Sequence, residues 1–83
     1  MLGRRGRVRR RISMRLSARN QLPGTVKSVT TGTVMAEVVV EVAGGYQLVA
    51  AITAESARQL GLTAGKRVVA VVKSTEVMIG VED

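Results

Sequence analysis

The chain has 83 residues, with no cysteine, no histidine and a single aromatic residue, Tyr46. This length predicts one domain, and the missing residue types exclude disulfides and argue against a transition-metal site or a histidine general base. The net charge of +7 is unevenly placed, because residues 1–15 hold seven arginines and no acid, whereas residues 16–83 hold six basic and six acidic residues.

Residues 1–15 form an Arg/Gly segment without apolar periodicity, and we expect a disordered tail there. No apolar stretch follows the charges, as a secretory signal would require, and none is long enough for a membrane span, so a cytoplasmic protein is predicted. The tail is either an arm that contacts nucleic acid or anionic lipid through its charge, or an appendage without such a role, for example translated sequence upstream of a true start at Met14. We favour the second interpretation.

Residues 16–83 show the alternation of apolar and polar residues that is typical of strands. We predict five strands, at residues 22–29, 33–42, 46–52, 67–73 and 77–81. A bulge or bend is expected near Pro23-Gly24, because proline cannot donate to a ladder. Gly44-Gly45 predicts a hairpin turn.

One short helix is predicted over residues 54–60. Thr53 is the candidate N-cap, and Gly61 suits the left-handed position after the helix. Five strands with one short helix predict an all-β fold, a small OB-like Greek-key barrel. Its core of Val, Ala, Leu and Ile lacks large aromatic residues, so we expect oligomerisation to supply further stability.

The candidate binding residues are cations and small hydroxyl residues in three places: Ser17 and Arg19, Thr53 and Ser56, and Lys73 and Ser74. A tetrahedral oxyanion only accepts hydrogen bonds, so its site needs hydroxyl and N–H donors and one or two cations. Each pair also has an ordinary structural explanation, as a solvated strand end, a capping pair or a turn. Spacing in the sequence does not show whether the three pairs meet.

Three stretches also carry a family resemblance: Ser17-Ala18-Arg19-Asn20-Gln21-Leu22-Pro23-Gly24, Ala51–Ser56 with Leu60-Gly61-Leu62, and Val71–Ile79. In this order and spacing they resemble the Mop, or molbindin, family of TOBE-like molybdate/tungstate-binding domains. The resemblance covers about Met14 to Val81 and leaves out the tail, so residues 16–83 are interpreted as one Mop domain.

The resemblance implies a protein that stores or buffers molybdate or tungstate between subunits, with no catalytic cofactor and no metal beyond the oxyanion itself. We do not expect an enzyme, because the sequence offers neither a nucleophile–base pair nor a set of metal ligands. The resemblance also implies a homo-oligomer, a hexamer built as a trimer of dimers with exchanged strands. The oxyanion-binding residues carried over from the family are Ser17, Arg19, Asn20, Thr53, Ser56, Lys73 and Ser74.

Two alternatives remain open at this point. One is a nucleic-acid-binding OB-type protein that acts through its arginine-rich tail, against which stand the single aromatic residue and the neutral domain. The other is a regulatory molybdate-sensing module, although the sequence holds neither a P-loop motif nor a recognition-helix domain.

Overall fold

The structure is a computed structural model that describes residues 17–82, so the predicted disordered tail over residues 1–15 lies outside the described residues. The described part holds four strands: β2 (Asn20–Thr31), β3 (Met35–Val42), β4 (Gln47–Thr53) and β5 (Arg67–Val72). It also holds one short helix and two single 3-10 turns: α1 (Ala54–Gln59), η1 (Ala43–Gly45) and η2 (Ser74–Glu76).

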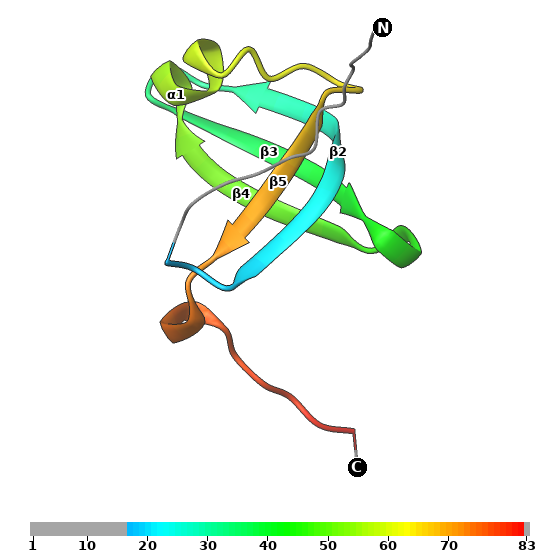
Figure 1. The fold of residues 1–83 in the computed structure, drawn as a ribbon. Coiled ribbons are helices and arrows are strands. Elements are labelled where there is room, and N and C mark those ends of the chain that lie inside the picture. Colours follow the sequence, from blue (N-terminus) through cyan, green and yellow to red (C-terminus); the bar gives the residue numbers. More distant parts are fainter. Residues whose placement is uncertain (1–16, 83) are drawn as a thin grey trace, which may run out of the picture.

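The strands form one antiparallel sheet in the order β4-β3-β2-β5. Three strands follow one another through hairpin connections, and the fourth returns to lie beside the first, which is the Greek-key order. The sheet curls round on itself, with α1 across one end (Figure 1). The predicted all-β fold with one short helix is therefore confirmed.

The predicted fifth strand over residues 77–81 does not form within the single chain. After η2 these residues run away from the sheet (Figure 1) and form no strand pairing within the described residues. Their apolar side chains are exposed, at 92% for Met78, 85% for Ile79 and 82% for Val81. Alternating apolar residues specify which side chains share a face, but not which strand will pair with them.

Strand β2 organises the sheet because it pairs with two neighbours. Its first half pairs with β5, from Asn20 to Thr25, and its second half pairs with β3, from Gly24 onward. Both pairings include Gly24, where an added Cβ would lie 2.6 Å from the Glu41 carbonyl oxygen and 2.8 Å from Val40 Cγ1. The expected irregularity in this strand lies farther along, where the register with β3 shifts between Val26 and Ser28.

The core is small and aliphatic. Val26, Val38 and Val40 form a buried cluster, with exposed fractions of 1%, 2% and 5%. The alternation predicted for the second strand is confirmed by Ala36, Val38 and Val40, which are all buried, but Val34 at its start is exposed. Two further buried apolar residues, Ala54 and Ala57, belong to α1 and pack it onto the sheet.

Both ends of α1 follow the predicted capping pattern. Thr53 caps the start with its side chain, and Gly61 has a φ of +65°. The Gly61 N–H donates to Arg58 O at 3.0 Å and the Leu62 N–H to Ala57 O at 3.1 Å, which is the Schellman arrangement. No helix in residues 17–82 is long and apolar enough to cross a membrane.

We predict that Gly24→Ala destabilises the fold by about 2 kcal/mol, because the added methyl group meets backbone and a core valine at less than van der Waals distance. Urea unfolding at a fixed protein concentration measures the change. Gly80→Ala is the matched control, since a Cβ there meets nothing within 4 Å. Equal stability of the two variants would contradict the role given to Gly24.

Candidate functional site

Three of the seven candidate residues line one cavity. Arg19 and Asn20, at the start of β2, lie with Ser74 along a hollow of about 610 Å³. The antiparallel pairing of Asn20 with Val72 brings the start of β2 to the end of β5, so residues more than fifty positions apart in the sequence become neighbours.

Local hydrogen bonds shape both sides of this cavity. On one side, Gln21 Nε2 donates to the Ala18 carbonyl oxygen at 2.7 Å, which folds the segment that carries Arg19. On the other side, the Glu76 N–H donates to the Lys73 carbonyl oxygen at 2.9 Å and turns the chain at Ser74.

Two further candidates do not line the cavity but are close in sequence to residues that do. Ser17 precedes β2 and is exposed, and Lys73 follows β5 and is also exposed. Arg19 and Lys73 form no ion pair with any residue in 17–82. Their charges are therefore available to an anion.

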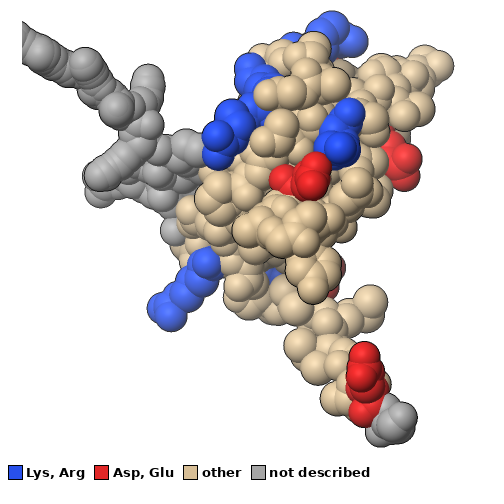
Figure 2. Space-filling model, turned by 90° about the vertical axis from the view of Figure 1, so that its right-hand side faces the viewer, with Lys and Arg blue, Asp and Glu red and all other residues tan. Residues whose placement is uncertain are grey.

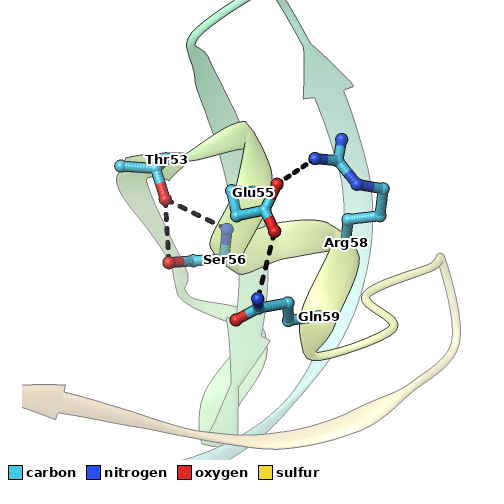
Figure 3. A network of polar contacts seen from close by, with 5 residues as sticks. All are labelled: Thr53, Glu55, Ser56, Arg58 and Gln59. Atoms are coloured by element: carbon cyan, nitrogen blue, oxygen red, sulfur yellow. Dashed lines mark hydrogen bonds and ion pairs between the residues drawn. The ribbon is translucent and has the colours of Figure 1, made fainter.

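The other two candidates form a hydroxyl pair at the start of α1. Thr53 Oγ1 accepts a hydrogen bond from the Ser56 N–H at 3.0 Å and donates to Ser56 Oγ at 2.8 Å (Figure 3). With this arrangement the Thr53 proton is already used, whereas the Ser56 hydroxyl proton is free to point outward. Thr53 thus orients Ser56.

The same helix carries an acidic residue that is held by two neighbours. Arg58 Nη2 contacts Glu55 Oε1, and Gln59 Nε2 donates to Glu55 Oε2 at 3.0 Å. Figure 3 shows the Glu55 carboxylate directed toward these two side chains and away from the hydroxyl pair.

Within one chain the two groups of candidates lie at opposite ends of the sheet. Thr53 pairs with Met35, the first residue of β3, whereas Asn20 lies beyond the last residue of β3, which pairs with Gly24. Figure 1 shows α1 and the turn after β5 at opposite ends of the molecule. The structure therefore brings Arg19, Asn20 and Ser74 together and leaves Thr53 and Ser56 apart from them.

Several cavity residues were not among the sequence candidates. They are neutral or apolar and contribute shape: Gln21, Leu22, Leu48, Val72 and Val77. Gln21 and Leu22 lie in the first matched stretch, and Val72 and Val77 in the third, so four of them were within reach of sequence reasoning. Leu48 comes from β4, and nothing in its sequence neighbourhood indicates a binding role.

Charges in the described part are mixed in sign. Lys27 Nζ pairs with Glu41 Oε1 at 3.3 Å, and Arg58 pairs with Glu55. In Figure 2 the basic side chains lie in separate groups, and one of them touches an acidic side chain. Residues 17–82 contain no cluster of three or more side chains suited to holding a metal ion.

The geometry defines a class of protein, a small curled β domain with cations and hydroxyl groups at its strand ends. Comparison with known proteins places this domain in a family, because the TOBE domain model matches residues 16–79. Molybdenum-pterin-binding protein 2 of Clostridium pasteurianum is 50% identical over 66 residues, which cover 80% of this chain and 97% of that protein.

Solved structures agree with the sequence match. MopII from Clostridium pasteurianum superposes with a TM-score of 0.77 at 48% identity, covering 81% of this chain and all of that one. The molybdate-bound structure of the cytoplasmic molybdate-binding protein ModG superposes with a TM-score of 0.71 at 54% identity, covering 74% of this chain and 43% of that one. This chain belongs to the TOBE-domain family, among the molybdenum-pterin-binding (Mop) proteins, and the resemblance noted in the sequence is confirmed.

We predict that Thr53→Ala lowers the free energy of unfolding by about 1 kcal/mol, because the Ser56 N–H loses its capping acceptor. Thr53→Ser keeps the hydroxyl and is the matched control. Ser56→Ala keeps the capped N–H and should change stability by less than about 0.5 kcal/mol. Urea unfolding of the three variants tests this division, and a Ser56→Ala loss equal to that of Thr53→Ala would contradict it.

Proposed function

We propose that this protein binds molybdate or tungstate as the intact oxyanion and stores or buffers it in the cytoplasm. The observation that carries the proposal is the convergence of Arg19, Asn20 and Ser74 on one cavity, in a chain whose matched relatives are named as molybdenum-pterin-binding or molybdate-binding proteins. The ligand is the cargo of the protein and not a catalytic cofactor.

The chemistry of the cavity suits a tetrahedral dianion. Arg19 offers a planar fork of donors, Asn20 an amide N–H₂ and Ser74 a hydroxyl, and Lys73 lies directly beside Ser74. The described residues that line the cavity include no carboxylate that would repel an anion. Ser17 is the remaining donor at the start of β2.

The complete site, in this proposal, is shared between subunits. Ser56 and its orienting partner Thr53 lie too far from Arg19 to join the same site within one chain, since they occupy the other end of the sheet. A second copy would bring its α1 to the start of β2. The assembly we propose is a hexamer, arranged as a trimer of dimers.

Exposed apolar surface supports this assembly. The sheet carries a groove of about 510 Å³ that is lined by apolar residues from all four strands, and Val49 on β4 and Val71 on β5 are 63% and 41% exposed. The segment 77–81 carries alternating apolar residues and extends away from its own sheet (Figure 1). We propose that this segment pairs with a second copy, as an exchanged strand that covers such a groove.

Selection among oxyanions follows from size. Sulfate has the charge and shape of molybdate with shorter bonds, so donors placed for the larger ion would bind sulfate weakly. Molybdate and tungstate are nearly the same size, and we expect the protein to bind both.

The binding proposal predicts that Arg19→Gln weakens molybdate affinity at least about tenfold, because a charge-assisted hydrogen bond is lost. Titration calorimetry with the full chain measures Kd, with sulfate as the comparison anion. Lys27→Gln removes an equal charge from a lysine that pairs with Glu41 and serves as the control. Absence of molybdate binding by the folded wild-type protein would overturn the proposed function.

The assembly proposal predicts that Ile79→Glu lowers the molar mass in solution, because a charge on the apolar face of the exchanged strand cannot be buried unpaired. Light scattering after size exclusion measures the mass. Met78→Glu places the same charge on the alternate face and should leave the assembly intact. A monomeric wild-type protein, or dissociation by neither variant, would contradict strand exchange.

A further inference from the structure

The proposed hydroxyl donors have an acidic neighbour, and a site for dianions must keep its carboxylate away from the bound anion. Glu55 lies between Thr53 and Ser56 in the sequence, in the first turn of α1. A free carboxylate beside Ser56 would repel any anion. It would also offer an acceptor to an anion that carries a proton.

The structure holds this carboxylate away from the hydroxyl pair. One of its oxygens contacts Arg58 Nη2, and the other accepts a hydrogen bond from Gln59 Nε2 at 3.0 Å. In Figure 3 the Glu55 carboxylate points toward Arg58 and Gln59 and away from the hydroxyl pair of Thr53 and Ser56. Both oxygens are therefore engaged by side chains that, among the described residues, form no side-chain hydrogen bond with the hydroxyl pair.

We propose that Arg58 and Gln59 are specificity-determining positioning residues, which make the site selective for fully deprotonated oxyanions by keeping Glu55 turned away. The inference rests on the proposed function, because it assumes that Ser56 donates to the anion. Molybdate, tungstate and sulfate have no proton at neutral pH, whereas phosphate keeps at least one.

A role of Arg58 and Gln59 through charge and a role through hydrogen bonding predict different changes in the relative affinities for phosphate and sulfate. The observed change therefore identifies which role the two residues have. Loss of positive charge at Arg58 would weaken phosphate and sulfate alike. Release of the Glu55 carboxylate would add an acceptor that only the protonated anion can use, so phosphate would gain relative to sulfate. Sulfate and phosphate have nearly the same size, so a change in cavity dimensions would leave their ratio unchanged.

The expected effect is modest because the network is exposed. Arg58 and Glu55 side chains are 67% and 63% exposed. We expect the phosphate-to-sulfate ratio of affinities to rise about threefold when the carboxylate is released, the size typical of an exposed charged contact.

The experiment uses the full chain with Arg58→Met and Gln59→Met combined, since methionine keeps the length and helix propensity of both residues. Inhibition constants of inorganic phosphate and of sulfate are measured against bound molybdate. The double variant should favour phosphate over sulfate by about threefold relative to wild type, and adding Glu55→Ala should restore the wild-type ratio. Lys27→Met, which breaks the separate Lys27–Glu41 pair, should leave the ratio unchanged.

Two other results would overturn the inference. One is an unchanged phosphate-to-sulfate ratio of affinities in the double variant. The other is a changed ratio that persists after Glu55→Ala is added. In both cases molybdate binding by the wild type would leave the proposed function standing. If the folded wild-type protein binds no molybdate, the proposed function and this inference fail together, so the two failures are distinguishable.

Discussion

The fold depends on the double pairing of β2. This strand of 12 residues pairs with β5 through its first half and with β3 through its second half, and the change of partner takes place around Gly24. A side chain at that position would clash with the backbone of Glu41. Because glycine has no side chain, the β2–β3 and β2–β5 pairings can both include this residue. The curl of the sheet, the cluster around Val26 and the convergence of Arg19 with Ser74 all follow from this one strand.

Sequence patterns predicted the parts of the fold that are determined locally. The valine alternation of β3, the Thr53 cap and the Gly61 termination of α1 are each specified by residues close to one another, and the structure contains all three. The fifth strand was predicted by the same kind of pattern over residues 77–81, yet the chain has no pairing for it among residues 17–82. Periodicity fixes the faces of a strand, whereas its neighbour depends on residues remote in the sequence or on another chain.

The same limit applies to the candidate site. Short motifs identified Arg19, Asn20 and Ser74, because donor residues beside strand ends are visible in the sequence. Their convergence is a consequence of the register between β2 and β5, which no local pattern specifies. Leu48 could not have been found, since it contributes only apolar surface and reaches the cavity through its place on β4.

Under the proposed function, the separation of the two groups of candidate residues would connect binding to assembly. If a bound oxyanion is held by Arg19 of one chain and Ser56 of another, it stabilises the contact between them, and by linkage the assembled protein binds the oxyanion more tightly than a single chain does. Such coupling suits a domain whose buried core consists of valine and alanine and which leaves the apolar residues Val49, Val71 and Ile79 exposed. In the proposed assembly, a second copy of the chain would both cover the apolar surface that a single chain leaves exposed and complete the oxyanion site.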